Sequence, residues 1–588
     1  NIPEIGPDAF SKADTGATED TRIQNLSVRE DTVGVRDEDA PTAPDAPEAT
    51  GVLAATIFAE LDSGAGSDGA EVVAHEDGKL YVTNGSFDTI DVFDLADPDA
   101  GPTRIDLTLL QDYDGVQSVA IANGLIAVAV ARADVGGLSQ PGFVAFYEAG
   151  SLDLLGRVDV GNLPDQLTFN ADGSSLLVAG EGEFNADTID DGRTDNPLGT
   201  VAVITPDLSD LSASDVQLLD FTGFDGSEDQ LRLDGVRVQE GVDFSLDAEP
   251  EYVAITADGL TAFVSLQENN AVAKIDLATN TVLEVLSLGT VDFSKPGQEI
   301  DANDNSIIQI RNFDNLVGFR MADSIDTFEV GGATYLVTAN EGDSRDFDED
   351  RVGGLVEDGL VDESVDTTGL ERLEVSSIDG DTDGDGDIDV LHIFSSRSFS
   401  IFDADGNLVF DSGSQFEAII AELAPERFND DDGDDGEDRS DAKGPEPEAI
   451  TIGEVAGNIY AFIGLERDSG IMIYDVTSPA DASFVTYIPP LHVDNAAEGE
   501  TARHAPEIIT FIEAADSLSG CIRHIIQIAI RVGLVVVDGG RHNAGPQRHH
   551  GDKRLQGPAG CRQMPRHALR AGDGNVVGAI PQRAFRRQ

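Results

Sequence analysis

The most specific group of potential ligands in the sequence is a run of aspartates, 379-DGDTDGDGDID-389. Acidic residues at alternate positions followed by a glycine, Gly386, have the spacing of a calcium-binding loop, because the glycine permits the sharp turn that lets carboxylates converge. His392 stands where an EF-hand has its final Glu. We therefore predict a strand-to-strand Ca²⁺ loop; the alternative is an acidic loop that only contacts solvent. The candidate ligands are Asp381, Asp383, Asp385, Asp387 and Asp389. A second acidic run, 429-NDDDGDDGEDRSD-441, lacks this regular spacing.

Carboxylates also bracket pairs of predicted strands. In 445-PEPEAITIGEVAGNIYAFIGLERDSGIMIYDV-476, one acid precedes an alternating apolar run and another follows the next run, and 250-PEYVAITADGLTAFVSLQENNAVAKID-276 has the same layout. Oxygen ligands at this density suit Ca²⁺, Mg²⁺ or Mn²⁺. The candidate metal ligands at these brackets are Glu251, Glu268, Glu341, Asp343, Glu448 and Glu466. The alternative is that each acid only ends a turn and caps backbone N–H groups.

The brackets belong to a unit that recurs along the chain. Each unit has short alternating apolar runs separated by Asp-Gly or Asn-Gly turns, which predict antiparallel hairpins. Small sheets of this kind cannot bury their faces alone, but radial stacking buries them. We predict an all-β fold over 51–517, a seven- or eight-bladed β-propeller with acidic insertion loops. The strand at 52–61 precedes the first unit and is a candidate to complete the final blade.

A propeller would place these acids on one rim. The innermost strand of a blade and its neighbour are antiparallel, so the start of the first and the end of the second meet on one face. Like charges crowded around a channel are unfavourable unless cations compensate them. Arg345 and Arg467 lie among the acids and are the candidate catalytic residues, because an arginine fork suits a phosphate or carboxylate ligand. The sequence has no GxSxG, HExxH or P-loop motif.

The composition favours cations as partners. With 112 acidic and 36 basic residues, the formal net charge is −76. A polyanion such as nucleic acid would be repelled, and no apolar stretch is long enough for a transmembrane segment. The excess of acids over lysines is also typical of proteins from saline habitats, so a halophilic origin is an alternative explanation of the charge.

The ends of the chain differ from its body. Residues 1–50 are acidic and poor in large apolar residues, which predicts a disordered leader or linker. Residues 518–588 are basic, contain both cysteines and show no regular period, and the last unit, beginning at 506, stops before its second strand. This irregular tail is either a basic segment that folds back on the acidic body or the product of an out-of-frame translation. A signal peptide and an anchor are not visible, and we expect the true N-terminus to be missing.

Several motifs resemble the choice-of-anchor I family, a group of secreted or surface-attached bacterial β-propeller proteins related to mesenchyme-specific cell surface glycoproteins. The motifs are 80-LYVTNGSFDTIDVFDL-95, 337-VTANEGDSRDF-347, 380-GDTDGDGDID-389, 397-RSFSIFDADGNLVFDSG-413 and 443-KGPEPEAITIG-453. The resemblance covers about 52–517 and implies an extracellular or cell-surface location. It also makes phosphoesterase chemistry plausible, because some members are regarded as alkaline phosphatases or phytase-like esterases. The stretch 517-SLSGCIRHIIQIAIRVG-533 departs from the family pattern.

Two functions are consistent with these observations. The first is a calcium-binding surface module that binds a glycan, a protein or another component of the extracellular matrix through an acidic rim. The alternative is a metal-dependent phosphoesterase, in which the ions polarise a phosphate ester and Arg345 or Arg467 holds its oxygens. The sequence leaves the ligand, the metal, the number of blades and the type of anchor open.

Overall fold

The structure is a computed structural model that describes most of the chain between residues 44 and 539. Within that span the described residues are interrupted at 48, 51–52, 62, 64–71, 98–99, 137, 185–195, 306, 346, 431–436, 490–492, 495–500, 503–505, 513–523 and 529–531. The predictions for 1–43, for 540–588 and for Glu71 therefore lie outside the described residues.

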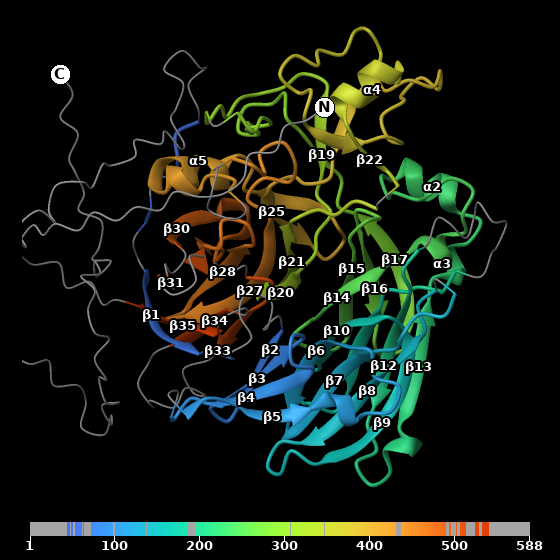
Figure 1. The fold of residues 1–588 in the computed structure, drawn as a ribbon, viewed down its shortest axis with the longest axis vertical. Coiled ribbons are helices and arrows are strands. Elements are labelled where there is room, and N and C mark those ends of the chain that lie inside the picture. Colours follow the sequence, from blue (N-terminus) through green and yellow to red (C-terminus); the bar gives the residue numbers. More distant parts are fainter. Residues whose placement is uncertain are drawn as a thin grey trace, which may run out of the picture.

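Seven four-stranded antiparallel sheets make up the body of the protein (Figure 1). Blade 1 contains β2 (Val73–Glu76), β3 (Lys79–Asn84), β4 (Thr89–Asp94) and β5 (Thr103–Asp106). Blade 2 contains β6 (Gly115–Ala122), β7 (Leu125–Ala131), β8 (Pro141–Glu148) and β9 (Leu154–Asn162). Blade 3 contains β10 (Pro164–Phe169), β11 (Leu176–Gly180), β12 (Thr200–Thr205) and β13 (Asp215–Asp220). Blade 4 contains β14 (Pro250–Ile255), β15 (Thr261–Leu266), β16 (Ala271–Asp276) and β17 (Thr281–Ser287).

The remaining three blades complete the ring. Blade 5 contains β20 (Ile325–Val330), β21 (Ala333–Asn340), β25 (Ser398–Asp403) and β26 (Leu408–Asp411). Blade 6 contains β27 (Pro447–Val455), β28 (Asn458–Leu465), β29 (Ile471–Asp475) and β30 (Ser483–Ile488). Blade 7 contains β33 (Ile509–Ile512), β34 (His524–Ile528), β35 (Val532–Gly539) and β1 (Leu53–Leu61). The innermost strands contact one another in the cyclic order β2, β6, β10, β14, β20, β27, β33 and back to β2. The propeller prediction is confirmed, with seven four-stranded blades in the described part of the chain.

The burial pattern explains why the sequence forms these sheets. Every residue of β7 is buried, and this strand reads as the continuous apolar run LIAVAVA, because it lies between the faces of neighbouring blades. The outermost strand β17 instead exposes Thr281, Leu283 and Glu284. Strands buried on both faces lose the polar alternation that half-buried strands keep.

Blade 7 corrects one expectation and confirms another. The sequence predicted that this unit stops after its first strand, but β33 pairs with β34, and β34 pairs with β35. That expectation is wrong for 524–539, where HIIQI and VGLVVVDG are runs of high β-propensity. The predicted closing strand is confirmed, since β1 pairs with β35 along its length, from Leu53 opposite Gly539 to Leu61 opposite Val532.

Blade 5 corrects a second expectation. From its apolar pattern alone, 373–413 is interpreted as a degenerate repeat unit of its own, but β25 and β26 are the third and fourth strands of blade 5. Pairing with β21 spans a long insertion, with Asn340 opposite Ser398. The misreading arose because alternating apolar residues mark a strand without showing which blade it joins.

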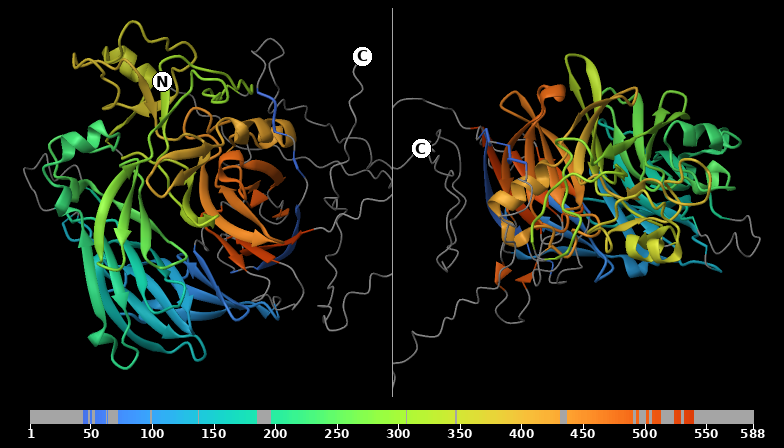
Figure 2. Two further views of the ribbon diagram at one scale, coloured as in Figure 1. Left: turned by 180° about the vertical axis from the view of Figure 1, so that it is seen from behind. Right: turned by 90° about the horizontal axis from the view of Figure 1, so that it is seen from above.

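Most elements outside the blades lie in the connections before, within and after blade 5 or, like two short helices, in the connection between blades 3 and 4 (Figure 2). A three-stranded sheet joins β18 (Thr290–Asp292), β19 (Leu316–Phe319) and β24 (Leu391–Ile393). A two-stranded sheet joins β22 (Glu349–Arg351) and β23 (Glu374–Ser376). The helices are α2 (Glu228–Leu233), α3 (Phe244–Asp247), α4 (Val352–Asp358) and α5 (Gln415–Leu423). Short 3₁₀ turns lie at Leu107–Leu109, Leu211–Ala213, Thr222–Phe224, Pro425–Arg427 and Pro479–Asp481, and β31 (Val493–Asp494) pairs with β32 (Thr501–Ala502).

Candidate metal centre at the channel mouth

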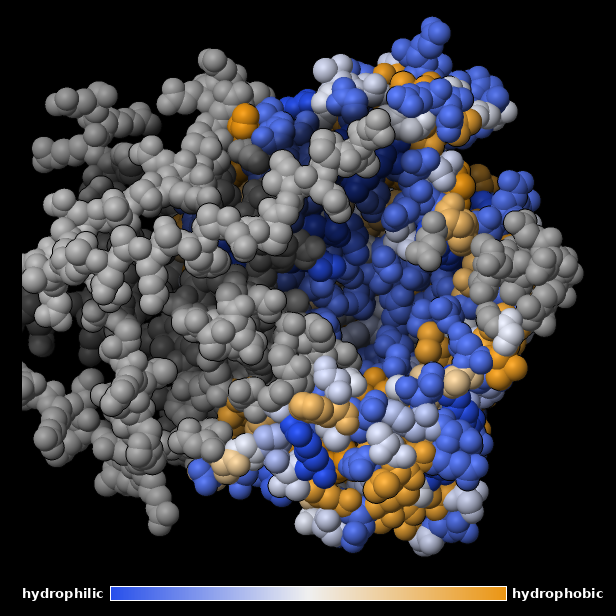
Figure 3. Space-filling view, viewed as in Figure 1, coloured by the Kyte–Doolittle hydropathy of each residue, from blue (hydrophilic) through white to orange (hydrophobic). Residues whose placement is uncertain are grey.

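Acids at the starts of innermost strands, including the predicted ligand Glu448, gather at one mouth of the central channel. A cavity of about 420 Å³ opens there, and Asp165, Asp323, Glu448 and Glu507 are among the residues that line it. Each of these residues lies at or just before the start of an innermost strand. Hydrophilic residues border the hollow near the centre of the face seen in Figure 3 wherever described residues are visible there. The register of the blades therefore converts a repeated position in the sequence into one charged surface.

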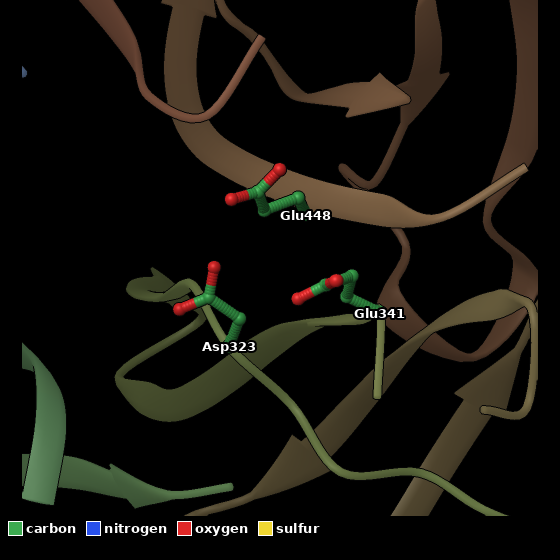
Figure 4. A group of neighbouring side chains, drawn as sticks. All are labelled: Asp323, Glu341 and Glu448. Carbon is green, nitrogen blue, oxygen red and sulfur yellow. The ribbon is translucent and has the colours of Figure 1, made fainter. Parts of the chain in front are cut away.

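Three carboxylates at this mouth point toward a common space. Asp323 precedes β20, Glu341 follows β21, and Glu448 lies at the start of β27 (Figure 4). One oxygen atom of each lies within 4.8 Å of the others. Two of these residues come from blade 5 and one from blade 6, so the contact between neighbouring blades assembles the group. We call these three residues the mouth triad.

Two carboxylates of the mouth triad carry an electrostatic penalty that the described residues leave unrelieved. Burial and the neighbouring Glu341 carboxylate raise the pKa of both Asp323 and Glu448 well above the usual range. Among the described residues, Oε2 of Glu448 has no hydrogen-bond partner. A partly buried carboxylate beside other carboxylates is stabilised by either a proton or a cation.

A second group of carboxylates has its own counterions. Oxygen atoms of Glu341, Glu446 and Glu466 lie within 4.8 Å of one another. Lys443 Nζ lies 2.8 Å from Glu341 and 3.7 Å from Glu446, and the Arg467 guanidinium lies 3.0 Å from Glu446. Burial alone would raise the pKa of Glu446, but these cations hold it below its usual value. This group therefore has less need of a metal ion than the mouth triad.

Blade 4 contributes a further pair of buried carboxylates, of which Glu268 is partly offset by the Arg345 guanidinium. Glu251 and Glu268 are both buried, and among the described residues Oε2 of each has no hydrogen-bond partner. Burial and the Glu268 carboxylate raise the pKa of Glu251 well above its usual range. Burial and the Glu249 carboxylate raise the pKa of Glu268 to about 8. The structure thus places both predicted ligands of this blade where a cation would relieve them.

The two candidate catalytic arginines bind carboxylates of the protein itself. Arg345 is buried, its Nη2 lies 2.6 Å from Glu249, and its Nη1 lies 3.2 Å from Asp247. Arg467 lies 3.0 Å from Glu446 and 3.3 Å from Glu466. The remaining predicted ligand, Asp343, is half exposed and lies 3.8 Å from Lys443.

Some residues of the site were missed or misplaced by the sequence reasoning. Glu446 was not singled out, although the doubled Pro-Glu of 445-PEPE-448 marks it. Asn84 and Asn340 end second strands, the position at which the repeat pattern predicts a rim residue. Their amides instead donate within their own blades, Asn84 to Asp91 and Asn340 to Ser398 and Ser400. Both asparagines are fully buried, so they stabilise strands rather than bind ligands.

The predicted Ca²⁺ loop lies in the blade 5 insertion, between β23 and β24, as a strand-to-strand connection. Oxygen atoms of Asp381, Asp383 and Asp385 lie within 4.8 Å of one another, and all three side chains are exposed. Asp381 accepts the N–H groups of Gly384 at 2.7 Å and Gly386 at 2.9 Å. The turn that brings these carboxylates together is therefore already formed.

The last two predicted ligands of the loop have different surroundings. Desolvation and the Asp385 carboxylate raise the pKa of Asp387 to about 6. Asp389 accepts from the backbone N–H and the hydroxyl of Thr382 at 2.9 and 2.6 Å, which closes the base of the loop. The metal binding of all five aspartates remains a prediction.

We expect Asp383→Asn to weaken Ca²⁺ binding at this loop without unfolding the protein. Asp383 is exposed, so the stability of the metal-free protein should change by no more than about 0.5 kcal/mol. Calorimetric titration with CaCl₂ measures the loss, and Glu357→Gln on the exposed end of α4 is the control. Unchanged binding in Asp383→Asn would exclude the loop as a Ca²⁺ site.

The fold and the mouth define a seven-bladed β-propeller with an acidic channel entrance. Residues 71–479 match the choice-of-anchor I domain, and the chain belongs to this family. Mesenchyme-specific cell surface glycoprotein of Strongylocentrotus purpuratus is 28% identical over 284 residues, which cover 40% of this chain and 35% of that protein. Gigasin-3a of Magallana gigas is 34% identical over 116 residues, which cover 18% of this chain and 40% of that protein. The matched regions thus span well under half of either relative.

Solved propellers resemble the chain only coarsely. A streptogramin B lyase structure has a TM-score of 0.39 at 10% identity and covers 83% of this chain and 97% of its own. The WD40 domain of Toxoplasma gondii coronin has a TM-score of 0.40 at 10% identity and covers 85% and 90%. The blade assignment accordingly rests on the strand pairing. None of the helices in the described part of the chain has the length and apolar character needed to cross a bilayer.

Proposed function

We propose that the protein is an extracellular or cell-surface propeller that binds Ca²⁺ at its acidic channel mouth and uses this mouth to bind an external ligand. The observation that carries the proposal is the mouth triad of Asp323, Glu341 and Glu448, with ligand oxygens within 4.8 Å of one another. Among the ion pairs of the described residues, Lys443 contacts Glu341 but neither Asp323 nor Glu448. A divalent cation would replace the protons that Asp323 and Glu448 otherwise require.

The ligand chemistry favours Ca²⁺ over other divalent ions. All the candidate ligands are carboxylates, and the mouth opens into a cavity of about 420 Å³ that has room for water ligands. Ca²⁺ accepts six to eight oxygen ligands in flexible geometry, whereas Mg²⁺ requires a near-ideal octahedron. Glu251 and Glu268 are the candidates for a second ion in the same ring.

The surface role is supported by the relatives and by the chemistry of the mouth. One relative is a cell surface glycoprotein by name, although only 35% of it is matched. A Ca²⁺ ion that keeps water ligands can exchange them for carboxylate or hydroxyl oxygens of a partner. A glycan or matrix component with such groups is therefore the class of ligand that we propose.

We expect Glu448→Gln to weaken Ca²⁺ binding at the mouth by about tenfold or more, roughly 1.4 kcal/mol or above. The amide keeps the shape but removes one anionic ligand from the mouth triad. Calorimetric titration with CaCl₂ measures the change. Glu454→Gln, at an exposed position of the same strand, is the matched control and should bind as the unmodified protein does. Equal affinity in the two variants would refute the proposed site.

The phosphoesterase alternative has no specific observation in its favour. Both candidate arginines are engaged by carboxylates, Arg345 by Glu249 and Arg467 by Glu446. We therefore expect no turnover of p-nitrophenyl phosphate with CaCl₂, MgCl₂ or MnCl₂. Turnover that is lost in Glu448→Gln and kept in Glu454→Gln would instead favour the enzyme.

A further inference from the structure

The second acidic run, at 429–441, has a buried base. The N–H of Glu437 donates to the Phe428 carbonyl at 3.0 Å, and the N–H of Arg439 donates to the Asn429 carbonyl at 2.9 Å. Asn429 and Glu437 both have left-handed backbones, with φ of 45° and 67°. Such conformations are uncommon for residues other than glycine. The surrounding contacts therefore hold the two side chains in a defined place.

Three oxygen atoms at this base have no hydrogen-bond partner among the described residues. Glu437 is 1% exposed, and both of its carboxylate oxygens are unpartnered. Asn429 is fully buried; its Nδ2 donates to Glu417 at 3.0 Å and to Ser440 at 2.9 Å, while its Oδ1 is unpartnered. Burying a polar atom without a partner is unfavourable, so these three oxygens are suited to a ligand that all of them can bind.

The charges around the base are also unbalanced. Burial and the Asp301 carboxylate raise the pKa of Glu437 to about 8; the Ile307 N–H acts against this rise, and Glu417 and Asp304 add to it. Burial raises the pKa of Asp301 itself to about 7. The buried guanidinium of Arg397 pairs with Glu417 at 2.7 Å, which offsets one of these carboxylates. The Glu437 and Asp301 carboxylates remain, and that of Asp301 also accepts the N–H groups of Asn303 and Gln309.

We propose that the Glu437 carboxylate and Asn429 Oδ1, together with Asp301, bind a divalent cation, preferentially Ca²⁺. One hard cation would satisfy all three unpartnered oxygens and the excess charge at once. Because Asn429 donates to Glu417 of α5, the ion would tie the acidic run to this helix and to the loop at Asp301. The site shares no residue with the mouth triad or with the loop at 379–389.

Calorimetric titration of metal-free protein with CaCl₂ tests the site. We expect Glu437→Gln to bind one Ca²⁺ fewer than the unmodified protein. The control Glu426→Gln removes an exposed carboxylate nearby in the same connection and should bind the full number. An unchanged number of bound ions in Glu437→Gln would overturn the proposal. Because both variants keep every ligand of the channel mouth, this test is independent of the proposed mouth site.

A second measurement keeps the test decisive if Glu437→Gln fails to fold. Crystals of the unmodified protein soaked in MnCl₂ should show an anomalous peak within bonding distance of the Glu437 carboxylate. Absence of this peak would overturn the proposal. The competing explanation, a permanently protonated Glu437, predicts an infrared band of a neutral carboxylic acid that CaCl₂ leaves in place, and that result would also overturn it.

Discussion

We expect the metal-free protein to become less stable as the pH rises from about 5 to about 8, and CaCl₂ to reverse much of this loss. Burial raises the pKa of Asp165 to about 7, and burial together with Glu341 and Glu446 raises the pKa of Glu466 to about 7, although Arg467 opposes the shift of Glu466. In the unfolded chain these groups titrate near 4.

The sign follows from proton linkage. Between the two pKa values the folded state binds more protons than the unfolded state, so raising the pH favours unfolding. The stabilising contribution is complete below about pH 4 and is lost as the pH passes the folded values of about 7 to 8. One pKa unit corresponds to about 1.4 kcal/mol, so several such groups amount to several kcal/mol. A ligand at a hundred times its Kd restores about 2.7 kcal/mol.

Urea unfolding at pH 5.5, 7 and 8.5, with EGTA or with CaCl₂, measures this dependence. General repulsion within a chain of net charge −76 has the same sign, so the series is repeated in concentrated KCl, which screens surface charges but not buried ones. The double variant Glu251→Gln/Glu268→Gln should flatten the dependence. A stability that rises between pH 5.5 and 8.5 without metal would contradict the account of the channel mouth.

The second large effect is expected from Arg397→Met. Arg397 is 1% exposed and lies between blade 5 and α5. Its Nη1 lies 2.7 Å from Glu417, and its Nη2 donates to the carbonyls of Ser440 and Ala442, both at 2.8 Å. The substitution leaves a buried carboxylate without its counterion, which costs about 3–5 kcal/mol. Chemical denaturation should show this loss in the midpoint.

Two further variants isolate the cause. Arg372→Met removes a guanidinium that is 65% exposed, and the loss should stay below about 1 kcal/mol although Arg372 contacts Asp304 and Asp441. Adding Glu417→Gln to Arg397→Met should recover part of the lost stability, because the unpaired charge is then gone. If the double variant is as unstable as the sum of the single variants, lost packing rather than charge explains the effect.

The rim of acids was predictable because it follows from local rules. Alternating apolar residues and Asp-Gly turns mark hairpins, and a hairpin places the start of one strand beside the end of the next. This hairpin rule was sufficient to predict that Glu251 lies near Glu268 and that Glu448 lies near Glu466. The closing strand β1 was predictable for a similar reason, since its alternation precedes the first blade.

The compensation of charge within the rim was not predictable. Lys443 and Glu341 are 102 residues apart, and Arg345 and Glu249 are 96 apart. Which acid receives an internal cation depends on how the insertion and the neighbouring blades pack, and no local pattern encodes this. The pairing of β25 was not predictable either, because its partner β21 lies on the other side of the insertion. The burial of Glu437 was also not predictable, since the acidic run that contains it has no regular spacing.

The order of residues was enough to predict a ring of antiparallel sheets with carboxylates at the strand ends, because strand periodicity and turn chemistry act over a few residues. The folded arrangement was needed to show that Asp323, Glu341 and Glu448 face one another across two blades, whereas Glu446 is surrounded by basic side chains. The physical reason is that burial and Coulomb interactions depend on distances in space, and the residues concerned are brought together only when the blades pack.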